Sequence, residues 1–215
     1  MMEQNIPNLE AAEQRVLGSL MEKSRTTPDH YPMTLNSLAA ACNQKTSRYP
    51  IVQYDEELII QTLDSLKRKG LISTATGGSS RVVKFKHNFA IVYPLVPSEL
   101  TIICLLLLRG PLTPGELNTN SARLYEFETL DEVTEVLQKL SLPEMAFVKA
   151  MIRRPGQKEV RYVHLLGDAP DKSLEASPEM PSIANTAQLE ERVAKLEDQL
   201  NELRAEFDKL MKELN

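Results

Sequence analysis

The sequence predicts a mainly α-helical protein with small β-hairpins (α+β), arranged as two tandem winged-helix domains followed by a C-terminal coiled-coil helix. Two observations lead to this fold class. The order of three helices and one hairpin occurs twice, over residues 1–94 and 95–168, as a degenerate internal repeat. A proline-containing polar segment at 169–187, expected to be a flexible linker, then precedes an unbroken heptad pattern at 188–215.

The first expected domain begins with two helices. In residues 9–21 apolar side chains recur with the 3.6-residue period of an amphipathic helix, and Asn8 is available as its N-cap. After a turn and a short extended segment, Thr34 can cap a second helix that continues to about Cys42. Both helices have an apolar face that can contribute to one core.

A third helix and a hairpin complete this domain. Asp55 can cap the helix, and Gly70 is suited to the residue that follows its end. Extended runs at 71–76 and 81–87 flank a loop of Gly and Ser, which is typical of a β-hairpin. The third helix is expected to bury Leu58, Ile59, Thr62, Leu63 and Leu66.

The second expected domain repeats this order. A very apolar helix is predicted at 98–108, a short helix that opens at Thr113, and a third helix at 129–140. A second hairpin is predicted from extended runs at 147–153 and 159–166. The third helix is expected to face the core with Leu130, Val133, Val136, Leu137 and Leu140.

The C-terminal segment carries apolar residues that are spaced alternately by four and three, as in the a/d seam of a coiled coil. In this register Arg192 falls at g and Glu197 at the following e, where a parallel partner chain would pair them. The sequence therefore predicts a parallel homodimer through this helix, with packing of the helix on its own globular domains as the alternative. The predicted dimer seam consists of Leu189, Val193, Leu196, Leu200, Leu203, Phe207, Leu210 and Leu214.

Composition gives weak support to nucleic-acid binding. The formal net charge is −5, and residues 1–94 carry 11 Lys or Arg and 9 Asp or Glu, whereas residues 169–215 carry 6 and 11. Cys42 and Cys104 lie in apolar stretches without metal or redox spacing, so both are expected to be reduced core residues. The longest apolar run is far shorter than the ~20 residues that span a bilayer, and no signal peptide is recognisable. A cytoplasmic location without membrane contact is expected.

Acidic residues occupy the positions that would read bases in a helix-turn-helix protein. The start of the third helix carries Asp55, Glu56 and Glu57 in the first domain, and Asp131, Glu132 and Glu135 in the second. Phosphate would repel these side chains, so contact is expected instead through cations of the loops and wings. An alternative for each cation is a solubilising role on an exposed surface. The candidate nucleic-acid contacts are Lys45, Arg48, Lys67, Arg68, Lys69, Arg81, Lys84, Lys86, Arg153, Arg154, Lys158 and Arg161.

No arrangement of residues points to catalysis. His30, His87 and His164 have no carboxylate or cysteine at ligand spacing, and a hydrogen-bonded structural role is the default for each. The Gly77–Gly78 pair lies between two predicted strands, which is not the context of a phosphate-binding loop. The sequence therefore predicts no catalytic, cofactor-binding or metal site, and no enzyme.

Five strings add information that periodicity does not contain. TTPDHYP at 26–32, ACNQKTSR at 41–48, SRVVKFKH at 80–87, and RRPGQKE at 153–159 with RYVHLL at 161–166 together resemble the YceH-like family of uncharacterised bacterial proteins, over about residues 8–168. The resemblance implies a tandem winged-helix fold and no established activity, ligand or catalytic residue. The matching positions concentrate in the loop at 43–48 and in both wings, where a functional surface is therefore expected.

Two functions follow as hypotheses. The first is a dimeric double-stranded-DNA-binding protein, of the transcription-regulator kind, that uses wing and loop cations. The second is a scaffold whose winged helices dock on a protein partner, with the coiled coil supplying symmetry or a second partner.

Overall fold

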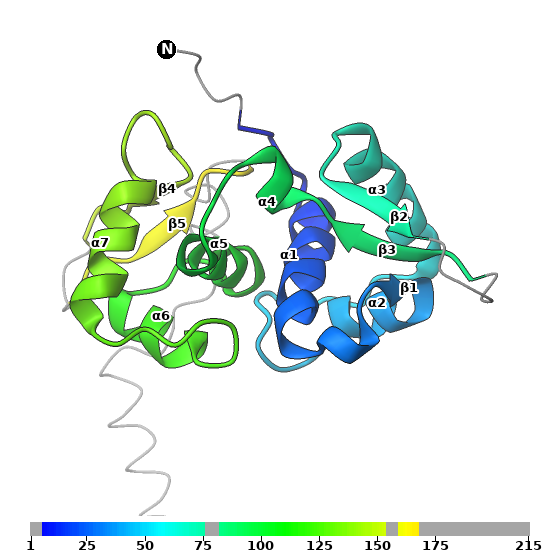
Figure 1. Ribbon diagram of the computed structural model, residues 1–215, viewed down its shortest axis with the longest axis horizontal. Coiled ribbons are helices and arrows are strands. Elements are labelled where there is room, and N and C mark those ends of the chain that lie inside the picture. The colour runs from blue at the N-terminus through cyan, green and yellow to red at the C-terminus, as the bar shows by residue number, and fades with distance from the viewer. Residues whose placement is uncertain (1–5, 76–81, 154–158, 168–215) are drawn as a thin grey trace, which may run out of the picture. The chain divides into compact units, whose positions relative to one another are not determined.

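The computed structural model describes residues 6–75, 82–153 and 159–167 (Figure 1). They belong to one compact unit, Met1–Ala169. The described chain is mainly helical with short antiparallel strands, as the sequence predicts. Its helices and strands are α1 (Ala11–Thr26), the 3₁₀ turn η1 (Pro28–His30), β1 (Met33–Thr34), α2 (Leu35–Cys42), α3 (Glu56–Arg68), β2 (Ile72–Ala75), β3 (Lys84–His87), α4 (Phe89–Val92), α5 (Pro97–Arg109), α6 (Pro114–Ser121), α7 (Leu130–Leu140), β4 (Val148–Ala150) and β5 (Tyr162–His164).

Local capping sets most helix starts as predicted. Thr34 Oγ1 accepts a hydrogen bond from the Ser37 N–H at the start of α2, and Asp55 Oδ1 accepts one from the Leu58 N–H at the start of α3. Gly70 follows α3 with φ 73°, a backbone conformation that favours glycine. The prediction for α1 was wrong at both ends, because Glu10 rather than Asn8 is its N-cap and it continues to Thr26.

The N-terminal half (α1 to α4) and the C-terminal half (α5 to β5) repeat one order of elements. In the first, β1 pairs with β3, which also pairs with β2, so the sheet order is β1-β3-β2. In the second, β4 pairs with β5, and a single bridge between Leu112 and Tyr162 takes the place of the β1–β3 pairing. The repeat in the sequence is therefore also a repeat of strand pairing.

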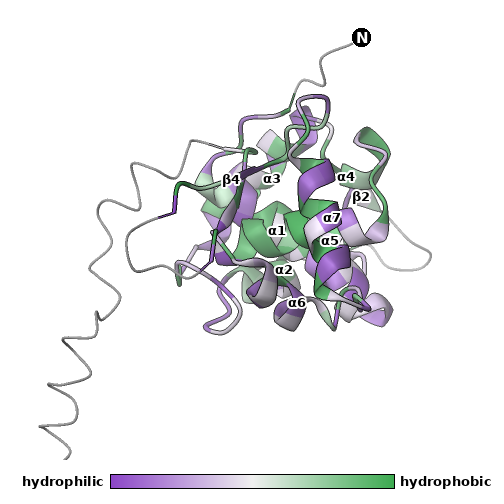
Figure 2. Cartoon of the chain, turned by 90° about the vertical axis from the view of Figure 1, so that its left-hand side faces the viewer, coloured by the Kyte–Doolittle hydropathy of each residue, from purple (hydrophilic) through white to green (hydrophobic). Residues whose placement is uncertain are grey.

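The two halves pack through α1 and α5, which lie side by side (Figure 1). A Cβ atom added to Gly18 of α1 would lie 2.9 Å from Leu108 Cδ2 and 3.2 Å from Leu107 Cβ, so the absence of a side chain allows this close approach. Figure 2 shows apolar α1 and α5 inside, with more polar helices such as α6 and α7 outside. The hydrophobic core is continuous between the halves.

Two residues expected in the core are exposed instead. Leu58 is 37% and Leu130 48% exposed, although both belong to predicted apolar faces. Each lies in the first turn of its helix, and the buried face begins only at Ile59 in α3 and at Val133 in α7. In each helix the apolar pattern of the sequence thus begins before the part that the core covers.

A buried glutamate at the third position of the first helix recurs in both halves. Glu13 Oε2 accepts from the Glu10 N–H (2.8 Å) and forms a salt bridge with Lys69 Nζ (2.6 Å). Glu99 Oε2 accepts from the Val96 N–H (3.0 Å), and its Oε1 lies 2.6 Å from Lys139 Nζ. Each glutamate therefore caps the first helix and ties it to the end of the third helix of the same half.

Replacement of Glu13 by glutamine tests this helix cap and salt bridge. Burial opposes ionisation, but hydrogen bonds from Lys69 and from the Glu10 N–H outweigh it and hold the pKa of Glu13 below its usual 4.5. The variant is expected to lose about 1–3 kcal/mol of unfolding free energy at neutral pH. Because the folded-state pKa is lowered, the stabilisation is present above the unfolded-state value and is lost as pH falls through the folded-state value.

Urea denaturation followed by far-UV circular dichroism at several pH values between neutral and acid measures the difference. Glu56→Gln is the matched control, because Glu56 is an exposed first-turn glutamate of α3. If the unfolding free energy of Glu13→Gln stays below that of the wild type by the same amount down to acid pH, the role of the charged carboxylate is contradicted.

Candidate nucleic-acid interface

The β2–β3 hairpin, which the sequence predicts to be the wing of the first domain, presents two lysines, Lys84 and Lys86, which we term the wing lysines. Alternation along β3 places them on the face opposite Phe85, which packs against the core. Lys86 is exposed and Lys84 half-buried, and Lys84 pairs in register with Thr34 and Ala75 on the two neighbouring strands. The central strand of a three-stranded sheet therefore holds both residues in place. Arg81, the third wing cation expected from the sequence, lies outside the described residues.

Two further cations lie where the wing begins. Lys67 and Arg68 are exposed in the last turn of α3. The Leu71 N–H donates to the Leu66 carbonyl (3.0 Å), so the chain passes directly from the end of α3 into β2. These cations consequently lie at the base of the hairpin. Lys84 is at the opposite end of β3, three residues or about 10 Å from His87.

Lys69 has a structural role. Its Nζ lies 2.6 Å from Glu13 Oε2 and donates to the Asn8 carbonyl (3.0 Å). The ammonium that was a candidate phosphate contact therefore neutralises a buried carboxylate.

Arg48 is also structural, which corrects its assignment to an exposed basic loop. Its side chain has no exposed area, and its guanidinium donates to both carboxylate oxygens of Glu22 (3.1 and 2.6 Å) and to the Ala41 carbonyl. The Glu22 side chain is itself only 15% exposed. A phosphate could reach Arg48 only if this buried pair opened.

The loop at 43–54 turns its most specific side chains inward. The Asn43 side chain donates to the Tyr54 carbonyl and accepts from the Tyr54 N–H, both at 2.8 Å. Arg15, which is 3% exposed, donates to the carbonyls of Cys42 and Pro50. The motif at 41–48 is therefore largely a folding motif, and Lys45 is the member of the predicted contact set that this loop exposes.

The β4–β5 pair, which the sequence predicts to be the second wing, is less basic than the sequence suggested. Arg161 forms two hydrogen bonds with the Glu116 carboxylate (2.9 and 2.8 Å) and one with the Pro111 carbonyl, so its charge is balanced. Arg153 is exposed, three residues after the end of β4. Arg154 and Lys158 lie outside the described residues.

Acidic residues do occupy the starts of both third helices. Glu56 and Glu57 are exposed at α3, as are Asp131 and Glu135 at α7. Glu132 instead accepts hydrogen bonds from the Tyr125 hydroxyl and the Glu128 N–H, both at 2.9 Å. This arrangement disfavours contact between phosphate and either helix start.

The remaining candidates are structural or lie outside the described part of the chain. His164 is buried, and its Nδ1 accepts from the Leu166 N–H; burial lowers its pKa to about 4. Cys42 and Cys104 are buried free thiols, as predicted. Among the described residues no three His, Cys, Asp or Glu side chains gather as metal ligands would, and no helix combines the length and hydrophobicity needed to cross a bilayer. All eight residues of the predicted dimer seam lie outside the described ranges.

Comparison with known proteins places the chain in a family. Residues 9–157 match the model of a family described as "Protein of unknown function, DUF480". This chain belongs to that family. DUF480 relatives called "UPF0502 protein" include one from Shewanella piezotolerans, 45% identical over 202 residues, with 90% of this chain and 93% of the relative covered. Another, from Opitutus terrae, is 45% identical over 193 residues, with 89% and 84% covered. The resemblance to a family of uncharacterised bacterial proteins is thereby confirmed.

Proposed function

We propose that this DUF480 protein is a non-catalytic winged-helix protein that binds double-stranded DNA through the wing lysines, with Lys67, Arg68 and Lys45 as further phosphate contacts. One observation carries the proposal. Neither Lys84 nor Lys86 has a carboxylate partner within the described residues, whereas Lys69, Arg48 and Arg161 all have one. Among the candidate contacts that the structure describes, the cations without a carboxylate partner thus include those of the wing and of the helix end beside it.

Charge also favours one way of docking. Lysines that meet phosphates release condensed counterions, which gives sequence-independent affinity. The acidic starts of α3 and α7 would be repelled by the same phosphates, so base reading by the third helix is disfavoured. Contact through the wing keeps Glu56 and Glu57 away from the backbone of the duplex. Residues 188–215 would add affinity by pairing two chains, as their heptad pattern predicts.

A salt-dependent titration of the full chain against a fluorescent random-sequence duplex tests the proposal. Lys84→Gln and Lys86→Gln are each expected to reduce the slope of log affinity against log salt by about 0.9, the value for one phosphate contact. Arg123→Gln removes one exposed cation outside the proposed contacts and should leave the slope unchanged. Absence of wild-type binding at tens of micromolar in low salt, or equal slopes for all variants, would refute the proposal.

Docking on a protein is the second candidate function, and the outer side of α3 favours it. Ile60 is 45% exposed, on the same side of the helix as the acidic residues Glu56 and Glu57 one turn earlier. A mixed apolar and acidic surface is unsuited to DNA but suits a protein partner. Recovery of one stoichiometric partner from nuclease-treated lysate, lost in Ile60→Ser and on deletion of residues 188–215, would support the scaffold over the DNA-binding protein.

A further inference from the structure

An uncharged apolar surface covers the segment that joins the two halves. Residues 88–98 contain no Asp, Glu, Lys, Arg or His, and the side chains that this segment exposes are all apolar. Ile91 is 80%, Val92 44% and Val96 49% exposed. An exposed apolar patch is typical of an interaction site. The surface, which we term the α4 patch, consists of Ile91, Val92, Pro94, Val96 and Pro97.

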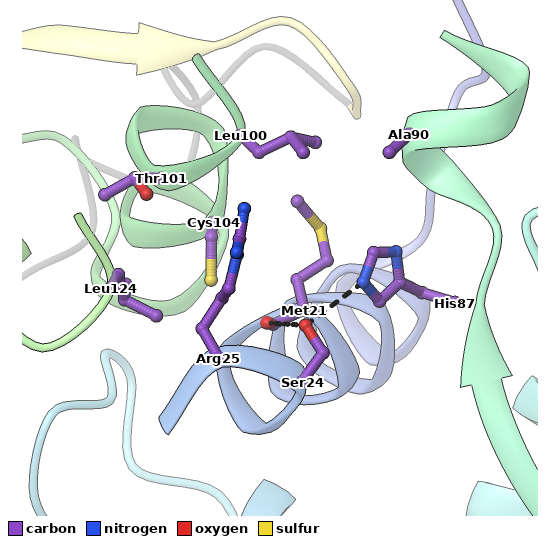
Figure 3. A pocket seen from close by; sticks show the side chains of 9 residues that line it. All are labelled: Met21, Ser24, Arg25, His87, Ala90, Leu100, Thr101, Cys104 and Leu124. Carbon is purple, nitrogen blue, oxygen red and sulfur yellow. Dashed lines mark hydrogen bonds between the residues drawn. The ribbon is translucent and has the colours of Figure 1, made fainter. Parts of the chain in front are cut away.

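The α4 patch is held in place from inside. Phe89 and Tyr93 are buried one turn apart, and their rings pack on that of Phe147, with centroids 6.1 and 5.2 Å away. Between them Ala90 lines a small cavity that α4 shares with α1 and α5 (Figure 3). The inner side of α4 is thus occupied by the fold, whereas its outer side carries Ile91. A preformed surface of this kind loses little conformational entropy on binding.

Two lysines adjoin the segment, and both are neutralised within the fold. Gly70 follows Lys69, which is salt-bridged to a buried glutamate, and the Gly70 carbonyl accepts a hydrogen bond from the Asn88 side chain (3.4 Å). At the other end Glu99 accepts from the N-cap N–H of α5, and its carboxylate lies 2.6 Å from Lys139 Nζ. The patch itself carries no cation, so it favours an apolar partner over an acidic chain segment or a nucleic acid.

A second copy of this chain supplies such a partner. Two like patches that meet about a two-fold axis bury apolar side chains, and homodimer interfaces are more apolar than the rest of the protein surface. The chain also leaves the described residues near the patch. The Leu9 N–H donates to the Leu166 carbonyl (2.8 Å), and the Asn8 carbonyl accepts from Lys69. Pairing of residues 188–215, which their heptad pattern predicts, would raise the effective concentration of one copy beside the other.

We propose that the α4 patch is an interface between two copies of this chain, in which the two patches meet about a two-fold axis. This contact is additional to the pairing that the heptad pattern predicts. It does not rest on DNA binding, because the wing lysines are not part of the patch. Since β3 ends directly before α4, the contact would hold the β2–β3 hairpins of the two copies in a fixed relation.

Sedimentation velocity of the full chain over a range of concentrations, without DNA, tests the proposal. The wild type is expected to dimerise, and Ile91→Glu is expected to weaken dimerisation at least about tenfold, because a two-fold interface buries the new charge in both copies. Ile152→Glu is the matched control, since Ile152 is 93% exposed outside the patch and its variant should dimerise as the wild type does. Far-UV circular dichroism and the urea midpoint of each variant report whether it is folded.

Cysteine cross-linking identifies the surfaces that meet. Ile91→Cys, Val92→Cys and Val96→Cys are each made in the full chain and mildly oxidised. At least one is expected to form a disulfide-linked dimer, because a two-fold contact brings identical residues together near its axis. Ile152→Cys should give far less dimer, and the two native cysteines are buried.

Four results would overturn the proposal. They are a wild type that stays monomeric at tens of micromolar, equal dimerisation of Ile91→Glu and the wild type, no cross-linked dimer from any of the three patch variants, and cross-linking of Ile152→Cys as complete as theirs. Equal dimerisation of Ile91→Glu and the wild type would assign the dimer to another part of the chain. Because none of these measurements contains DNA, their outcome is independent of the proposed DNA binding.

Discussion

Replacing Arg48 with alanine is expected to lower the free energy of unfolding by about 3–5 kcal/mol, because it removes one partner of a buried ion pair. Glu22 would lose both hydrogen bonds from the guanidinium, and the Ala41 carbonyl would lose its donor. Burial disfavours the charged form of Glu22, but the hydrogen bonds from Arg48 outweigh it and hold its pKa below the usual value. Without Arg48 that pKa should rise, and stability at neutral pH should fall.

Urea denaturation of the full chain, followed by far-UV circular dichroism, measures this loss. Lys45→Ala is the matched control, because Lys45 is an exposed cation of the same loop and should change stability by no more than about 0.5 kcal/mol. In a double-mutant cycle with Glu22→Gln, the double variant should lose less than the two single losses combined. If Arg48→Ala had wild-type stability but bound DNA more weakly, Arg48 would be a phosphate contact and not a structural residue.

The contrast between Arg48 and Lys45 shows which part of the candidate site the sequence could predict. Both are cations of one polar loop, and nothing in their neighbours distinguishes them. The carboxylate that pairs with Arg48 belongs to Glu22, 26 residues earlier, on α1. Burial of a long charged side chain depends on tertiary packing, so composition alone assigned both residues to an exposed surface.

Helix starts were predictable where the capping residue is local. Thr34, Asp55, Thr113 and Thr129 each accept from a backbone N–H within three residues, and all four were recognised or lay at the predicted boundary. The start of α1 was missed because its cap comes from the Glu13 side chain, without the Ser or Thr that marks the usual capping box.

The contact between the halves left no local signal. Gly18 could have been noticed as a glycine inside a helix, which costs roughly 1 kcal/mol relative to alanine unless packing requires it. The helix that approaches it, α5, begins about 80 residues later, so the sequence repeat indicated two similar halves but not how they meet.

Phe147→Ala is expected to lower the free energy of unfolding by about 3–5 kcal/mol, the range for truncation of a fully buried phenylalanine. The ring belongs to the C-terminal half but contacts two rings of the chain segment around α4. Its centroid lies 6.1 Å from that of Phe89 and 5.2 Å from that of Tyr93, in edge-to-face geometry. Loss of the ring therefore removes packing that joins the two halves.

Hydrogen exchange distinguishes a shared loss from a local one. If the halves unfold together, the slowest amides of α3 in Phe147→Ala should lose the same free energy as the whole chain loses in urea, although α3 is in the other half. A cycle of Phe89→Leu and Phe147→Leu, which keeps enough stability to measure, should show coupling of about 0.5–1.5 kcal/mol. Phe89→Leu with Phe127→Leu is the control, since the ring contact of Phe127 is with Tyr125 in its own half, and those two losses should add. Wild-type protection of α3 in Phe147→Ala would mean that each half folds by itself, with the α1–α5 contact a docking surface between two independently stable units.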